Sequence, residues 1–196
     1  DTNIIVISDE IYAELTYEGK HACFAELPGM WERTITLNGF SKAFAMTGWR
    51  LGYACGPTEL ISVLCKIHQY AIMCAPTAGQ FAAIEALKSS MQSDFAEVRR
   101  MVDTYDRRRR LIVSGLRNAG VTCHEPKGAF YAFPAVPKGL TSQQFCEKLL
   151  WEKKVAAVPG DAFGELGEGF FRCSYAASNE NILKAVERIG ELVSEL

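Results

Sequence analysis

The feature that most constrains the fold is the run Ile4–Ile7, four β-branched apolar residues followed at once by Ser8 and Asp9. A short continuous run of this kind is typical of a central strand covered on both faces. Residues 33–40 and 49–56 show two further strand patterns. In open α/β sheets, ligands bind beyond the carboxyl ends of the strands, so polar residues at those positions are the first candidates for a site.

Helical patterns follow the third strand. We expect helices from Pro57, with an apolar face of Leu60, Ile61, Leu64, Ile67 and Tyr70, and from Pro76 to about Leu87. The longest pattern covers 94–118 and is closed by Gly120. Beyond it we expect a hairpin of 121–126 and 128–136, a helix at 142–153, strands at 155–160 and 170–176, and a helix at 178–196 that opens with a capping box at Ser178 or Asn179. The chain is therefore α/β first, then a smaller α+β part.

The charge pattern excludes some classes of partner. The formal net charge is −2, so no nucleic-acid partner is implied. The run Arg107–Arg110 cannot form one helical face, because consecutive helical residues point about 100° apart, and we expect a solvated helix flank. No apolar run predicts a membrane span. Seven scattered cysteines without a C-x-x-C pair indicate reduced thiols in a cytoplasmic protein, and no metal site.

Candidate site residues follow the first two strands. Asp9 and Tyr12 come after the first, although Asp9 could simply cap a turn and Tyr12 could simply pack. Lys42 follows the second strand, and Arg50 leads into the third. A buried lysine can lose its proton and form a Schiff base, an arginine can bind a phosphate through two hydrogen bonds, and Gly39, Ser41 and Gly48 would let an anion approach. From composition alone, an ordinary solvated Lys42–Arg50 loop remains possible.

The segment GFSKAFAMTGWRLG, residues 39–52, resembles the lysine signature of class I/II aminotransferases, the fold-type-I pyridoxal-phosphate enzymes. Further segments are similar to the same family: ISDEIYAELTY, PKGAFYAFP, PGDAFG and FFRCSYAASNENILKAVERI. The resemblance extends over essentially the whole chain. It implies the C-terminal portion of the large cofactor-binding α/β domain at 1–105, followed by a small α+β domain at 106–196.

The resemblance also implies roles for individual residues. Lys42 would hold pyridoxal 5′-phosphate as a Schiff base and act as the general base. Asp9 would pair with the pyridine nitrogen, and Tyr12 would hydrogen-bond the ring's 3-oxygen. Arg50, helped by Ser41, would hold the phosphate. Arg172 would bind the substrate α-carboxylate, whereas Tyr53 and Phe130 could line the pocket or simply pack.

The implied reaction moves an amino group between an L-amino acid and a 2-oxo acid, and the segment 45–57 looks most like the bacterial aspartate and aromatic aminotransferases. A β- or γ-lyase on the same fold, or the effector domain of a transcription regulator, remains an alternative. Family members are about twice this length and typically form homodimers. We therefore expect a C-terminal part of a longer protein, catalytically incompetent or nearly so by itself.

Overall fold

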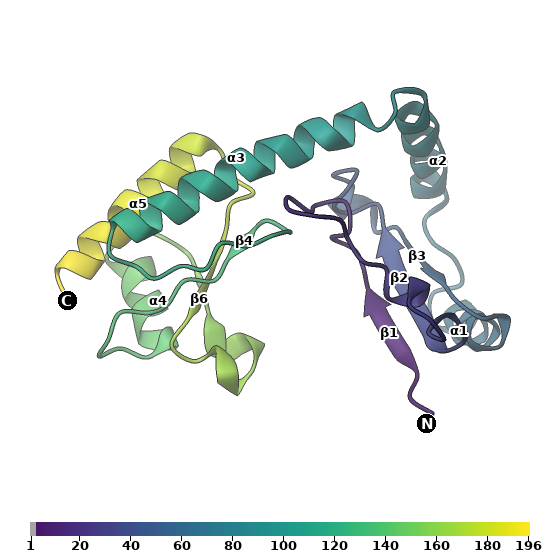
Figure 1. Ribbon diagram of the computed structural model, residues 1–196, viewed down its shortest axis with the longest axis horizontal. Coiled ribbons are helices and arrows are strands. Elements are labelled where there is room, and N and C mark those ends of the chain that lie inside the picture. Colours follow the sequence, from purple (N-terminus) through teal and green to yellow (C-terminus); the bar gives the residue numbers. More distant parts are fainter. Residues whose placement is uncertain (1–2) are drawn as a thin grey trace. The chain divides into compact units, whose positions relative to one another are not determined.

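The computed structural model describes residues 3–196 and divides into two compact units, one ending at Val102 and one running from Asp103 to Leu196 (Figure 1). In the first unit, β1 (Val6–Asp9), β2 (Thr34–Gly39) and β3 (Gly52–Cys55) form a sheet in the order β1-β2-β3. Strand β1 pairs with β2 in parallel, and β2 pairs with β3 antiparallel. The mixed α/β architecture predicted for this part is confirmed.

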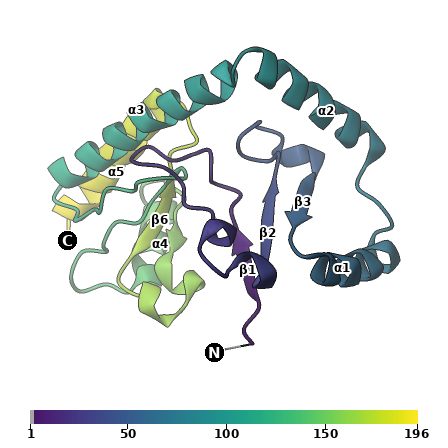
Figure 2. The same ribbon diagram turned by 45° about the vertical axis from the view of Figure 1, so that its right-hand side comes forward.

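The register of the two strand pairings places one end of each of the three strands together. Asp9, the last residue of β1, is opposite Leu37, and Gly39, the last residue of β2, is opposite Gly52, the first residue of β3. The carboxyl ends of β1 and β2 and the start of β3 therefore lie at the same end of the sheet, where the segments 10–24 and 40–51 leave it (Figure 2). We call this the carboxyl end of the sheet.

Helices complete the first unit: α1 (Thr58–Ala71), α2 (Thr77–Gln92) and the first turns of α3 (Ala96–Asn118). The short 3-10 segments are η1 (Phe24–Glu26), η2 (Trp31–Arg33) and η3 (Thr47–Trp49). Phe40, Met46 and Leu51, from the segment after β2, are buried against Ala83 of α2. This apolar contact joins the segment that carries Lys42 to a helix.

The second unit has its own antiparallel sheet, β4 (Tyr131–Ala132), β6 (Phe171–Ser174) and β5 (Val158–Pro159), in the order β4-β6-β5. Helix α4 (Ser142–Trp151) packs against α5 (Asn179–Ser194), and Val186 of α5 lies over Gly115 of α3. The segments η4 (Gly160–Phe163) and η5 (Glu165–Gly167) connect β5 to β6. Helices α3 and α5 run side by side in both views (Figures 1 and 2). The largest fully buried side chains here are Tyr175, Phe145, Phe171, Leu116, Leu149, Ile189 and Leu192.

The predicted strands at 33–40 and 170–176 and the predicted helices are confirmed, with α2 ending five residues later than expected, at Gln92. The strands predicted at 49–56 and 155–160 are present but shorter, as β3 and the two-residue β5. Ser178 is the N-cap of α5 and accepts a hydrogen bond from the Asn181 amide. The reciprocal capping box instead occurs at α4, between Thr141 and Gln144.

The expected burial of the first strand on both faces is wrong. Ile5 and Ile7 are 49% and 66% exposed, because the described residues do not cover the face of the sheet to which these side chains point. The apolar face predicted for α1 is likewise uncovered, since none of its residues is buried within the described part of the chain. For these two elements, periodicity predicted the type of secondary structure correctly and the burial of its apolar face incorrectly.

The predicted hairpin of 121–126 and 128–136 is also wrong. Residues 121–126 form no strand, and β4 is only two residues long and pairs with β6. Two prolines, Pro126 and Pro134, lack the backbone N–H that a ladder needs. A hydrogen bond from the Ala135 N–H to the Thr122 carbonyl, at 2.8 Å, links the two segments in place of a ladder.

The expected solvated flank at 107–110 holds for Arg107 and Arg110 and is wrong for Arg109, which is 5% exposed. Its Nε donates to Asp106 at 2.8 Å, and its Nη1 donates to the Pro126 carbonyl at 2.9 Å. A buried guanidinium needs such partners. Arg109 therefore ties α3 to the segment that leads into β4.

The thiols give a test of this packing. Burial raises the pKa of Cys146 to about 11 and that of Cys173 to about 12, whereas Cys55, Cys65 and Cys74 are exposed. Because the thiolate is the reactive form, a brief iodoacetamide treatment at mildly alkaline pH should modify the three exposed cysteines and leave these two buried ones intact until the chain is unfolded. Mass spectrometry of the peptides measures this. Modification of Cys173 as fast as Cys65 would contradict the packing of the second unit.

Candidate active site

Asp9 and Tyr12 lie on a tight turn at the carboxyl end of the sheet. The Asp9 side chain is exposed, and its Oδ1 accepts a hydrogen bond from the Ile11 N–H at 3.2 Å. The Glu10 N–H donates to the Leu37 carbonyl at 2.8 Å, and the Ala13 N–H donates to the Glu10 carbonyl at 2.9 Å. Asp9 therefore caps a turn, and the same turn places Tyr12, which is half-buried, beside the strand end.

Lys42 lies in the turn that directly follows β2. Its Nζ is 5.4 Å from the centroid of the Tyr12 ring, within the range of a cation–π contact. Ser41 and Lys42 are both half-buried. The structure thus brings together two residues that the sequence separates by thirty positions, at the end of the sheet where Asp9 also lies.

The loop from Ser41 to Arg50 is closed by two consecutive hydrogen bonds. The Thr47 hydroxyl donates to the Ser41 carbonyl at 2.9 Å, and Nη1 of Arg50 donates to the Thr47 carbonyl at 2.9 Å. Arg50 has a left-handed backbone conformation, with φ of 55°. The arginine side chain is therefore folded back onto its own loop at Thr47.

Gly39 has a different role from the anion access we expected. A Cβ at Gly39 would lie 2.8 Å from the Gly52 Cα and 2.8 Å from the Leu51 carbonyl oxygen. Two glycines opposite each other thus allow β2 and β3 to approach closely just before the lysine loop. A side chain at Gly39 would displace the loop that carries Lys42 and Arg50.

Glu10 is a site-adjacent residue that the sequence analysis missed. It is 6% exposed, its Oε2 lies 2.8 Å from His21 Nε2, and its Oε1 accepts from the Ser8 hydroxyl and the Phe24 N–H, both at 3.1 Å. Burial by itself raises the pKa of this carboxyl, but hydrogen bonds from His21, Phe24, Cys23 and Ser8 oppose it and leave the pKa lowered. Its position directly after Asp9 was the only signal in the sequence.

Arg172 lies on β6 in the second unit. Its guanidinium carbon is 4.4 Å from the centroid of the Tyr131 ring and 4.5 Å from that of Phe163. Within residues 3–196, no carboxylate forms an ion pair with it. Cation–π contacts contribute only about 0.5–1 kcal/mol at exposed sites, less than a charge-assisted hydrogen bond. The two rings therefore orient the guanidinium and leave its N–H groups for another acceptor.

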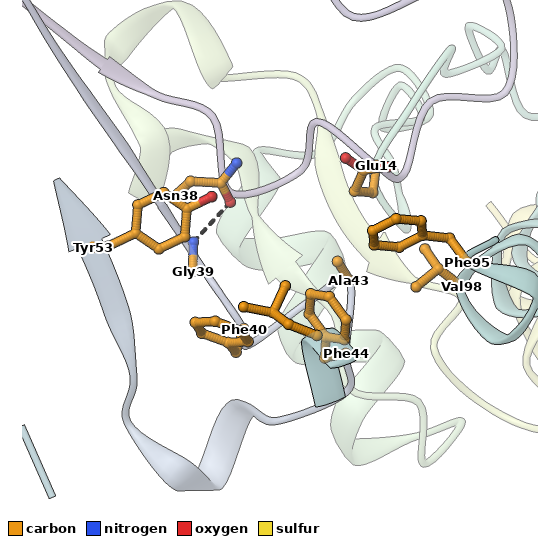
Figure 3. A pocket seen from close by; sticks show the side chains of 10 residues that line it. Glu14, Asn38, Gly39, Phe40, Ala43, Phe44, Tyr53, Phe95 and Val98 are labelled. Atoms are coloured by element: carbon orange, nitrogen blue, oxygen red, sulfur yellow. Dashed lines mark hydrogen bonds between the residues drawn. The ribbon is translucent and has the colours of Figure 1, made fainter. Parts of the chain in front are cut away.

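The two residues left open between pocket lining and packing behave differently. Phe130 packs against Tyr105 and Tyr131, with ring centroids 5.4 Å and 4.7 Å apart, as in a core. Tyr53 lines a mostly apolar pocket of the first unit (Figure 3), and burial raises the pKa of its hydroxyl. The other residues around this pocket are Glu14, Asn38, Gly39, Phe40, Ala43, Phe44, Leu87, Phe95 and Val98.

Among residues 3–196, no three histidine, cysteine, aspartate or glutamate side chains gather as a metal ion would require. The helices formed by these residues are all too short or too polar to cross a bilayer.

Comparison with known proteins agrees with this arrangement. A family model described as aminotransferase class I and II matches residues 1–189. YugH of Bacillus subtilis (strain 168), provisionally named an aminotransferase, is 54% identical over 188 residues, which are 95% of this chain and 48% of YugH. The aspartate aminotransferase of Pyrococcus abyssi (strain GE5 / Orsay) is 46% identical over 195 residues, 98% of this chain and 50% of that protein.

Solved structures give the same result. The crystal structure of the aromatic aminotransferase from Pyrococcus horikoshii OT3 superposes with a TM-score of 0.92 at 47% identity, covering 97% of this chain and 51% of that one. The chain spans about half the length of the curated relatives it matches. The predicted fold and the resemblance to this family are confirmed.

The Glu10 cluster gives a prediction about acid stability. Since the folded-state pKa lies below the ordinary value of 4.5, ionised Glu10 stabilises the fold above that pH, and this contribution is lost as the pH falls through the lowered pKa. Glu10→Gln should therefore lower the free energy of unfolding by about 1–3 kcal/mol at neutral pH, and by progressively less below pH 4.5.

Urea unfolding of both proteins over a pH series measures the difference, with Glu26→Gln, an exposed carboxylate on the same segment, as the matched control. A difference that stays constant from neutral to strongly acidic pH would show that ionised Glu10 has no such role.

Proposed function

Because the chain belongs to the class I and II aminotransferase family, we propose that it supplies the cofactor-holding part of an enzyme that moves an amino group between an L-amino acid and a 2-oxo acid. The observation that carries the proposal is the gathering of Lys42, Tyr12 and Asp9 at the carboxyl end of one small sheet. Arg50 lies in the loop that closes the same end.

The cofactor we infer is pyridoxal 5′-phosphate, because the chemistry of the donor set fits each of its groups. The Lys42 amine suits the aldehyde, and the Asp9 carboxylate suits a protonated ring nitrogen. The Tyr12 hydroxyl suits the ring's 3-oxygen. Arg50, whose guanidinium is folded back onto the loop that begins at Ser41, suits the phosphate together with the Ser41 hydroxyl. When bound, this cofactor supplies an electron sink for the bonds at the substrate α-carbon.

In this arrangement the residues of the chain bind, orient and move protons. Lys42, with its amine unprotonated, acts as the general base that takes a proton from the substrate α-carbon. The same group then acts as the general acid that donates this proton at a different atom. Its half-buried position beside the Tyr12 ring holds the amine at the carboxyl end of the sheet. The closed loop from Ser41 to Arg50 keeps the phosphate-binding group fixed while the lysine moves.

We propose Arg172 as the residue that binds the substrate α-carboxylate. A guanidinium presents two parallel N–H groups to a carboxylate, a geometry that lysine cannot provide. The Tyr131 and Phe163 rings that contact it support this role, because they limit its rotation without using its hydrogen bonds.

Two alternatives use the same fold. A β- or γ-lyase would use the same lysine to remove the α-proton, and a regulator domain would bind the cofactor without turnover. The names of the relatives, an aspartate aminotransferase and an aromatic aminotransferase among them, favour transamination of an acidic or aromatic amino acid. Formation of a 2-oxo acid with retention of the amino group on the cofactor separates transamination from a lyase, which releases ammonia.

The proposal extends to the oligomeric state, the cellular location and the activity of the isolated chain. We propose a homodimer in the cytoplasm, the latter because all seven cysteines are free thiols. We also propose that the isolated chain turns over little or no substrate, since it spans half the length of its relatives. Substantial transaminase turnover by the purified 196-residue chain would contradict this.

The cofactor assignment is tested by borohydride reduction of the protein mixed with pyridoxal 5′-phosphate, followed by peptide mapping. We expect the label on Lys42, loss of the label in Lys42→Ala, and no loss in Lys66→Ala, an exposed lysine of the same unit. A label distributed over surface lysines, with Lys42 unmodified, would contradict the proposed function.

The substrate role of Arg172 is tested by Arg172→Lys in the full-length protein. Because one of two parallel hydrogen bonds is lost, kcat/KM for the amino-acid donor should fall about 10- to 100-fold. The affinity for the cofactor should not change. Steady-state kinetics and cofactor titration measure the two, with Arg107→Lys, an exposed arginine of the same unit, as control. Unchanged kcat/KM in Arg172→Lys would exclude the assignment.

A further inference from the structure

We propose that Glu10 and His21 are a positioning pair that fixes the turn carrying Asp9 and Tyr12, and that His21 thereby contributes to cofactor binding without touching the cofactor. This inference rests on the proposed function, because it assigns the pair a role toward the residues that would hold pyridoxal 5′-phosphate. Neither residue was a candidate from the sequence.

The first observation is the density of bonds around one carboxylate. Glu10 has both oxygens engaged: Oε2 with His21 Nε2 at 2.8 Å, and Oε1 with the Ser8 hydroxyl and the Phe24 N–H, each at 3.1 Å. These partners come from β1 and from the segment 21–24. The carboxylate therefore clamps the strand end to a segment more than ten residues further along the chain.

The second observation is the side of the strand on which the clamp lies. Successive side chains of a strand point to opposite faces, so Ser8 and Glu10 share one face and Asp9 points to the other. Figure 2 shows the segment that leaves β1 returning over the same end of the sheet. The Glu10–His21 contact is thus behind the strand end, and Asp9 is on its opposite face, available to a ligand.

The third observation is that the clamp and the site share one turn. The Glu10 N–H and carbonyl bond Leu37 of β2 and Ala13, respectively, and the Leu15 N–H bonds the Tyr12 carbonyl at 2.9 Å. Leu15 is fully buried. A rotation of the Glu10 peptide would consequently turn Asp9 on one side and shift Tyr12 on the other.

A buried carboxylate is not explained by packing alone, because removing its charge from water costs free energy. An uncompensated charge at this position costs more than an apolar side chain of the same size would, and the cost is offset only while the donors are held in place. Outer groups that orient site residues are a recurrent use of such networks, because catalytic side chains must be held to within a fraction of an ångström. Of the two residues, His21 is the more suitable for substitution, because its side chain is 34% exposed and replacing it leaves no buried cavity.

The experiment compares His21→Ala with His21→Gln in the full-length protein. We expect His21→Ala to weaken the affinity for pyridoxal 5′-phosphate about tenfold, because a hydrogen bond to a charged group is lost. We also expect it to reduce the visible circular dichroism of the bound cofactor, which reports its orientation. His21→Gln keeps an N–H donor for Glu10 and should restore both. Glu10→Gln approaches the pair from the other side and should weaken affinity like His21→Ala.

One control variant and two possible results decide the test. Glu26→Gln is the matched control, an exposed carboxylate on the same segment, and should match the wild type. A purely structural role would lower the melting temperature of the cofactor-free His21→Ala protein while leaving affinity and dichroism per bound cofactor unchanged, and that result would overturn the proposal. A wild-type protein that binds no pyridoxal 5′-phosphate would overturn the proposed function and this inference with it.

Discussion

The parallel pairing of β1 with β2 is the constraint on which the rest of the site depends. It sets Asp9 opposite Leu37, so that the residues leaving β1 and those leaving β2 emerge at the same end of the sheet. The antiparallel return of β3, made close by Gly39 and Gly52, then brings the loop back to that end. Lys42 thereby comes to lie beside the Tyr12 ring, at the end of the sheet where Asp9 also lies.

Each residue that we propose to bind the cofactor or the substrate is fixed in place by neighbours outside the proposed site. Arg50 is fixed by the Thr47 carbonyl, and Thr47 by Ser41, so the loop has its own hydrogen-bonded frame. Glu10 fixes the carboxyl end of β1 in a similar way, through its hydrogen bond with His21. In the second unit the frame of Arg172 is aromatic. In each case the supporting residues leave some hydrogen-bonding groups, or one face, of the proposed binding residue open to a ligand.

Much of this arrangement is predictable from the sequence, for reasons that differ between residues. Lys42 and Asp9 follow β-branched runs, and the rule that sites lie at carboxyl ends of strands applies to them directly. The burial of Glu10 and Arg109 is not predictable, because it depends on partners such as His21 and Pro126 that lie well apart in sequence. Exposure of Ile7 escaped prediction for the converse reason: a strand pattern specifies that a face needs cover but not whether the described residues provide it.

The measurement that tests the central claim most directly is a crystal structure of the full-length protein grown with pyridoxal 5′-phosphate. The account predicts cofactor density at the carboxyl end of β1 and β2, continuous with the side chain of Lys42. The ring nitrogen should face Asp9, and the phosphate should lie against Ser41 and Arg50. Cofactor density elsewhere in the protein, with Lys42 and Arg50 turned toward solvent, would contradict it.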